Sequence, residues 1–132
     1  MIRKISKIKN LGRFENFESL REFGKNTIIF GFNGTGKSTL SDLFYSLSKE
    51  NGEGYLACRR TLNRDNECEE KKIQIEVKSD TEEVYSFSEN TWNHRPENLY
   101  VFNERYIEEH VFVSRQIEGN IVPIMMGHQE QA

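Results

Sequence analysis

The fold is decided by residues 27–40, which read TIIFGFNGTGKSTL. Residues 27–30 are β-branched or aromatic and are followed by Gly31, which is the length and flank of a fully buried strand. After the glycines, apolar residues recur at i, i+3, i+4 and i+7, and these are Leu40, Leu43, Phe44 and Leu47. This spacing predicts a helix with one apolar stripe over residues 37–48, followed by a stop at residues 51–54. A strand, a glycine loop and a helix therefore follow one another directly.

The loop itself matches GxxxxGK[ST] at every fixed position of residues 31–38. Glycines let backbone N–H groups converge on a phosphate, and the start of the following helix adds partial positive charge. Lys37 would neutralise the β- and γ-oxygens as the catalytic lysine, Ser38 would coordinate Mg²⁺, and Thr39 would donate to the α-phosphate. The loop predicts binding of a nucleoside triphosphate with Mg²⁺, and its binding residues are Gly31, Asn33, Gly34, Thr35, Gly36, Lys37, Ser38 and Thr39. No guanine-reading Asn-Lys-x-Asp is present, which favours ATP over GTP.

Composition excludes several classes of protein. The chain has 132 residues with a formal net charge of −3, and no apolar run approaches the length of a membrane span or of a secretory signal. Cys58 and Cys68 do not form a CxxC, so we expect two free thiols and a cytoplasmic protein without membrane contact. Residues 1–25 hold seven Lys/Arg against three Glu. This basic stretch is either a solvated strand face or a surface for nucleic-acid phosphates.

The remaining segments predict an α/β fold with an antiparallel β-rich insert. We expect a strand over residues 2–8 with a hairpin partner around 14–17, although the spacing of Ile2, Ile5 and Ile8 also suits a helix. Further predicted elements are a loop with some helix at 55–72, strands around 73–77, 84–87 and 99–102, and a helix at 104–112.

The chain lacks an apolar strand that ends in an acidic residue, which P-loop NTPases use to hold Mg²⁺. Asn103 stands where that acid is expected, and an amide there brings no negative charge. Two alternatives to an ATPase lobe are a small kinase-like enzyme, for which Arg59, Arg60 and Arg64 would supply a lid, and a nucleotide-sensing module without turnover. His94 could stack on a base beside Trp92, or could belong to an ordinary turn.

Several phrases resemble the N-terminal lobe of ABC-type ATPase heads from the SMC and double-strand-break-repair group. Residues 9–14 and 31–40 are similar to the start and the phosphate loop of those heads. Residues 101–107 and 121–127 resemble the closing part of the lobe in the anticodon-nuclease-type ATPases of bacteria (the PrrC/RloC group) and in phage-defence ATPases that carry an AAA label.

The resemblance covers residues 1–132 and implies an ABC/SMC-head-like P-loop NTPase lobe, with a coiled coil and a C-terminal lobe following in the complete protein. It implies that ATP and Mg²⁺ lie between two heads of a homodimer, that hydrolysis needs the C-terminal lobe of the same head, and that closure signals to nucleic acid or to an effector nuclease. It further implies that Arg13 reaches the nucleotide and that either Gln116 or Asn103 senses Mg²⁺. We expect these 132 residues alone to bind ATP without efficient hydrolysis.

Overall fold

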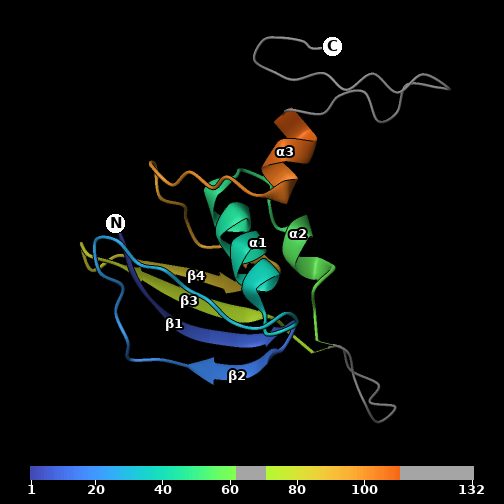
Figure 1. Cartoon of the computed structure of the whole chain (residues 1–132), viewed down its shortest axis with the longest axis horizontal. Coiled ribbons are helices and arrows are strands. Elements are labelled where there is room, and N and C mark those ends of the chain that lie inside the picture. Colours follow the sequence, from blue (N-terminus) through green and yellow to red (C-terminus); the bar gives the residue numbers. More distant parts are fainter. Residues whose placement is uncertain (62–70, 111–132) are drawn as a thin grey trace, which may run out of the picture. The chain divides into compact units, whose positions relative to one another are not determined.

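The computed structural model describes residues 1–61 and 71–110. The chain divides into two compact units, Met1–Leu99 and Tyr100–Ala132, and each is described by itself. The described part of the second unit contains the helix α3 (Glu104–His110). The elements of the first unit, labelled in Figure 1 where there is room, are β1 (Ile2–Leu11), β2 (Phe14–Glu18), α1 (Lys37–Ser48), α2 (Gly54–Ala57), β3 (Gln74–Ser79), β4 (Val84–Ser88) and β5 (Thr91–Trp92).

The five strands form one sheet in the order β2-β1-β3-β4-β5, and every neighbouring pair is antiparallel. β1 confirms the predicted N-terminal strand, and two register shifts explain its helix-like spacing. Ile5 lies opposite Val77 and Ile8 lies opposite Ile75, so a step of three on β1 matches a step of two on β3. The irregularity inserts one extra residue and keeps both isoleucines on the buried face.

α1 lies across one face of this sheet and closes the core (Figure 1). Its bounds are those that the apolar stripe predicts, and Leu43 and Leu47 are fully buried against the sheet. Trp92 on β5 is also buried, and its indole Nε1–H donates to Ser46 Oγ on α1 at 2.9 Å. Since β5 is only two residues long, its sequence carried no strand signal, and no strand was predicted there.

Two predicted buried strands are wrong. Residues 27–30 form no strand; Ile28 and Phe30 are 90% and 91% exposed. Residues 99–102 also form no strand, and Tyr100 and Phe102 are largely exposed. A buried strand needs a hydrogen-bonded neighbour on each side, and no described strand pairs with either segment.

The predicted α/β class is confirmed, but its arrangement is not the predicted one. The hairpin of β3 and β4 is no insert, because β3 pairs directly with β1 at the centre of a single antiparallel sheet. Within the predicted 55–72 loop, α2 supplies the expected short helix, and α3 begins where the 104–112 helix was predicted. Residues 62–70 and 111–132, which include Cys68, Gln116 and the phrase at 121–127, lie outside the described residues. No helix in the described ranges has both the length and the apolar character that crossing a bilayer requires.

Candidate nucleotide-binding site

The glycine loop adopts a backbone that only glycine readily takes at two of its positions. Gly34 has φ +82° and Gly36 has φ +110°, both in the left-handed region. A Cβ on Gly36 would lie 2.8 Å from the ring of Phe14 on β2, so the loop is packed against the sheet at this point. The glycines of the motif are therefore needed both for the turn and for the close approach of Phe14.

α1 begins directly after this loop, and the backbone N–H groups of its first turn have no side-chain cap. Gly36 is the N-cap residue, it supplies no side-chain cap, and the first turn holds no acidic residue. The first helical bond runs from Leu40 N–H to the Gly36 carbonyl oxygen at 3.0 Å. The backbone N–H groups of residues 37–39 precede that bond and have no partner within the helix. The positive end of the helix dipole lies at the same place, which suits an anion.

The polar side chains of the loop are arranged around its backbone carbonyls. The Lys37 ammonium donates to the Gly31 carbonyl oxygen, and the Thr35 hydroxyl donates to the Phe32 carbonyl oxygen at 2.6 Å. Ser38 is exposed, whereas Thr39 is buried with 5% exposure. The lysine is thus held across the mouth of the loop, where a phosphate would compete with a carbonyl for its charge.

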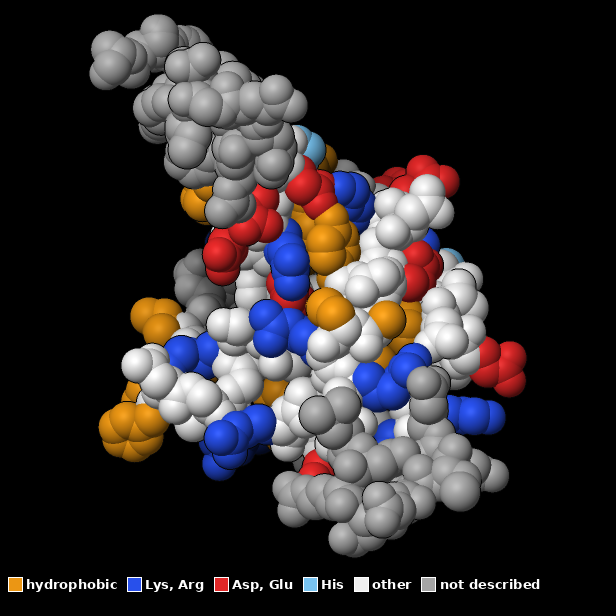
Figure 2. All heavy atoms as spheres, turned by 90° about the vertical axis from the view of Figure 1, so that its right-hand side faces the viewer, with side chains coloured by type: hydrophobic (Ala, Val, Ile, Leu, Met, Phe, Trp, Pro, Cys, Tyr) orange, Lys and Arg blue, Asp and Glu red, His pale blue; other side chains and the backbone are white. Residues whose placement is uncertain are grey.

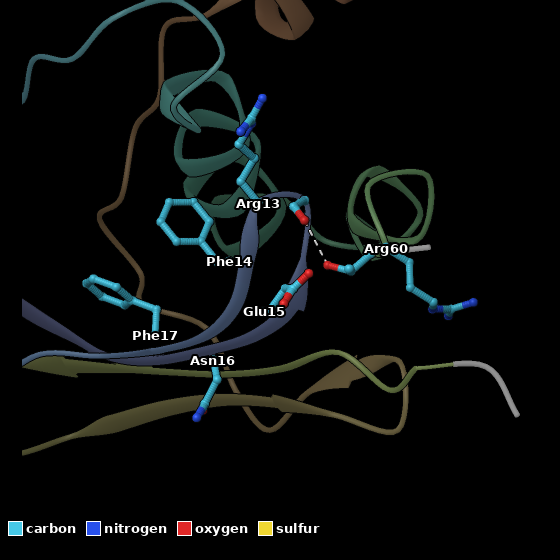
Figure 3. Close-up of a pocket in the computed structure, with 8 residues that line it drawn as sticks. Arg13, Phe14, Glu15, Asn16, Phe17 and Arg60 are labelled. Carbon is cyan, nitrogen blue, oxygen red and sulfur yellow. Dashed lines mark hydrogen bonds between the residues drawn. The ribbon is translucent and has the colours of Figure 1, made fainter. Parts of the chain in front are cut away.

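Arg13 approaches the loop from the turn between β1 and β2. Its Nη2 atom lies 3.8 Å from the position of a Cβ on Gly34. The same turn lines an open pocket of about 990 Å³ together with Phe14, Phe17 and Arg60, and Figure 3 shows that Arg13 and Arg60 point in different directions from it. The Arg13 guanidinium thus lies beside the phosphate loop, and its contact with a nucleotide stays a prediction.

Two arginines lie near the start of α1. Arg13 approaches Gly34, and Arg59, which follows α2 after Cys58, reaches Thr39 on α1 with its guanidinium. Figure 2 shows Lys and Arg side chains on one face of the molecule, with Asp and Glu side chains among them. Arg13 and Arg59 therefore supply positive charge that favours a polyanion at the loop.

Two predicted site residues, Asn103 and Gln116, lie outside the first unit. Asn103 lies in the second unit, where its side-chain oxygen accepts a hydrogen bond from Tyr106 N–H at 3.0 Å at the start of α3. Its role as a Mg²⁺ ligand stays a prediction, as does that of Gln116, which is not described. In residues 1–61 and 71–110, no group of three His, Cys, Asp or Glu side chains could hold a metal ion.

The ring of Trp92, which neighbours His94 in the sequence, is 4% exposed and belongs to the core. His94 packs on the ring of Tyr85, with 4.7 Å between the ring centroids. Cys58 is a free thiol, as expected, and its Sγ–H donates to the Tyr55 carbonyl oxygen. Arg59, which was considered for a lid, is bound to Asp42 instead.

Asp42, a buried carboxylate on α1, was not among the predicted site residues. The available signal was its position three residues after Thr39, because residues at i and i+3 share one side of a helix. An acidic residue so close to the apolar stripe of Leu40 and Leu43 needs a cationic partner, and Arg59 provides it.

A family model described as an AAA domain matches residues 10–131. The match spans most of the chain and includes the glycine loop and Arg13. It supports a nucleotide-binding, ATPase-like domain. No curated protein and no solved structure matches the chain.

Proposed function

Since the chain belongs to the AAA domain family, we propose that it binds ATP with Mg²⁺ through residues 31–39. The observation that carries this proposal is the geometry at the start of α1. Two glycines with positive φ turn the loop, and three uncapped backbone N–H groups follow at the positive end of a helix dipole. This arrangement offers a phosphate several donors at once.

Each side chain of the loop has a role in this proposal. Lys37 leaves the Gly31 carbonyl oxygen and binds the β- and γ-phosphates. Ser38, which is exposed, offers its hydroxyl to Mg²⁺. Arg13 approaches Gly34 from the β1–β2 turn and adds a second cation toward the nucleotide.

The chain acts as the N-terminal lobe of an SMC-like ATPase head in this proposal, with a C-terminal lobe of the same head as its partner. Support comes from residues 27–30, whose sequence is that of a buried strand and whose side chains are largely exposed. Residues 28–30 line an apolar groove of about 520 Å³ with Phe17, Phe23 and Leu40. Strands from the C-terminal lobe would pair with this segment and bury it.

Hydrolysis belongs to the complete head in this proposal. The C-terminal lobe supplies acidic residues for Mg²⁺, since no group of three His, Cys, Asp or Glu side chains in the described residues could hold a metal ion. A second head closes over the nucleotide in a homodimer. Transmission of that closure to nucleic acid or to an effector nuclease, as in antiviral defence or DNA repair, is the role that the family resemblance suggests. These 132 residues alone bind ATP and turn it over at background rate.

Binding of ATP by the purified chain tests the proposal. Displacement of a fluorescent ATP analogue by MgATP should be saturable, and Lys37→Ala should weaken it about 10- to 100-fold, because the ammonium pairs with phosphate oxygens. Lys78→Ala is the matched control, since it removes one positive charge from β3 and should leave the affinity unchanged. An equal loss of MgATP affinity in Lys37→Ala and Lys78→Ala would refute the proposal. So would the absence of any displacement of the analogue from the wild-type chain.

Turnover separates this proposal from a kinase-like enzyme. Phosphate release by the isolated chain should equal that of Lys37→Ala. Release well above that level would show that the chain needs no second lobe, and would favour a complete small enzyme.

A further inference from the structure

Asp42 is a buried carboxylate one helical turn beyond the glycine loop. It is 4% exposed, and its Oδ2 atom accepts a hydrogen bond from Arg59 Nε at 2.5 Å. The same guanidinium reaches in the other direction, where its Nη1 lies 3.4 Å from Thr39 Oγ1. One arginine thus joins the buried carboxylate to the last residue of the phosphate loop.

Thr39 is enclosed on its other side by the turn between β1 and β2. A Cβ on Gly12 would lie 2.9 Å from Thr39 Oγ1, so the glycine backbone passes directly over the hydroxyl. Gly12 N–H donates to the Arg59 carbonyl oxygen at 2.5 Å, and the Thr61 hydroxyl donates to the Gly12 carbonyl oxygen, the bond dashed in Figure 3. Residues 59–61 therefore hydrogen-bond to both Gly12, in the β1–β2 turn, and Thr39.

The hydrogen bond from Arg59 to Thr39 determines what the Thr39 hydroxyl hydrogen can do. A guanidinium has only donors, so Thr39 Oγ1 is the acceptor toward Arg59. The hydroxyl hydrogen of Thr39 therefore points away from Arg59. A hydroxyl whose oxygen is already engaged by a cation is a stronger donor, because the bonds polarise one another.

We propose that Asp42 and Arg59 are positioning residues that hold the Thr39 hydroxyl as a hydrogen-bond donor toward the phosphate of a bound nucleotide. The inference rests on the proposed function, since it concerns the same loop. Asp42 fixes Arg59 Nε, and this sets the plane of the guanidinium so that Nη1 meets Thr39. Arg59 acts through Thr39 and makes no contact with the nucleotide itself.

A double-mutant cycle on MgATP affinity tests this coupling. Arg59→Met keeps the aliphatic stem and removes the guanidinium, and Thr39→Val keeps the shape and removes the hydroxyl. Each change alone should weaken MgATP binding about 5- to 10-fold, in line with the loss of about one hydrogen bond. The double variant should bind no more weakly than Thr39→Val alone. Thr39→Ser restores the hydroxyl, so Arg59→Met should again weaken binding in that background.

Glu53→Gln is the matched control. It breaks a second arginine–carboxylate pair, Glu53 with Arg95 at 2.6 Å, which lies at the start of α2 and has no contact with Thr39. This variant should leave MgATP affinity unchanged. Thermal unfolding of every variant gives its folded fraction, and Arg59→Lys replaces Arg59→Met in the cycle if the latter is not folded.

The outcomes are distinct. If Arg59→Met weakens binding equally with and without the Thr39 hydroxyl, Arg59 acts directly on the nucleotide or through stability alone, and the inference is overturned. If wild type does not bind MgATP, the proposed function fails and this inference fails with it. Binding by wild type together with full coupling in the cycle supports both.

Discussion

Two stretches that carry isoleucine side chains have opposite environments in the described chain. Ile5, Ile8 and Leu11 on β1 are buried under α1, whereas Ile28 and Phe30 in the segment before the glycine loop are almost fully exposed. On β1 the isoleucines alternate with basic and polar residues, whereas residues 28–30 are three apolar side chains in a row. The difference is that β1 has hydrogen-bonded strands on both sides, while residues 27–30 have none among the described elements.

Contacts within the described residues bury the apolar side chains of β1 but not those of residues 27–30. The antiparallel sheet and α1 bury a continuous core and place the glycine loop at the start of the helix. The segment that leads into the loop has no such support from the sheet. Under the proposed function, this is the segment that a C-terminal lobe would cover.

The largest contrast comes from removing the same side chain in each stretch. Ile8→Ala leaves a cavity in the core and should lower the free energy of unfolding by about 2–5 kcal/mol. Ile28→Ala should change it by less than about 0.5 kcal/mol, because the side chain is 90% exposed. Urea denaturation followed by circular dichroism measures both. A large loss of unfolding free energy for Ile28→Ala would mean that residues 27–30 are packed in solution. The contrast with β1 would then be wrong.

A smaller effect is expected where the loop meets the sheet. Gly36→Ala places a Cβ at a φ of +110° and within 2.8 Å of the Phe14 ring, so it should destabilise the chain by about 1–3 kcal/mol. Gly24→Ala is the control, because its nearest contact would be the Asn26 carbonyl oxygen at 3.9 Å. Thermal unfolding compares them. Equal melting temperatures would show that the loop does not hold this backbone.

The join between α1 and β5 is tested by Ser46→Ala. This change leaves the buried Trp92 N–H without its acceptor and should cost about 1–2 kcal/mol. Trp92 is the only tryptophan, so its fluorescence reports the local environment directly. A variant with unchanged stability and unchanged emission would indicate that water reaches the indole.

The smallest effect concerns the pair of Glu53 and Arg95. Burial acts to raise the pKa of Glu53, but the hydrogen bond and the charge of Arg95, together with backbone hydrogen bonds, bring the pKa below its ordinary value of 4.5. A depressed folded-state pKa means that the unfolded chain binds the proton more tightly, so the pair stabilises the fold above pH 4.5. This contribution, about 1 kcal/mol or less, is lost as the pH falls through the folded-state pKa.

Comparing wild type with Glu53→Gln measures that contribution. The difference between their unfolding free energies should be constant from pH 7 to about pH 5 and should shrink below the ordinary pKa of a glutamate. If the difference in unfolding free energy grew toward low pH, the pKa of Glu53 would be raised in the fold, not lowered.

Local patterns in the sequence predicted the elements that the described chain completes by itself. The i, i+3, i+4, i+7 stripe defines α1 from Lys37 to Ser48, and alternation defines β3 and β4. The glycine motif predicted a tight loop before the helix, and Gly34 and Gly36 in that loop have positive φ angles. These patterns suffice because each depends on contacts within a few residues or with a hairpin neighbour.

Features that depend on distant partners were not predictable in the same way. Residues 27–30 carry the composition of a buried strand, but burial depends on neighbours that no local pattern specifies. The link from Asp42 to Arg59 spans 17 residues, so the cationic partner of the carboxylate could not be read from spacing. The threefold spacing on β1 was ambiguous because register shifts depend on β3, which lies more than 60 residues away.

The central claim is that main-chain N–H groups at the start of α1 hold a phosphate chain. Amide chemical shifts in an ¹⁵N-labelled sample titrated with MgATP test it most directly. The account predicts that the largest shifts belong to Gly34, Gly36, Lys37, Ser38 and Thr39 and are absent in Lys37→Ala at the same concentration. Shifts confined to other parts of the chain, or no shifts at millimolar MgATP in a folded sample, would contradict it.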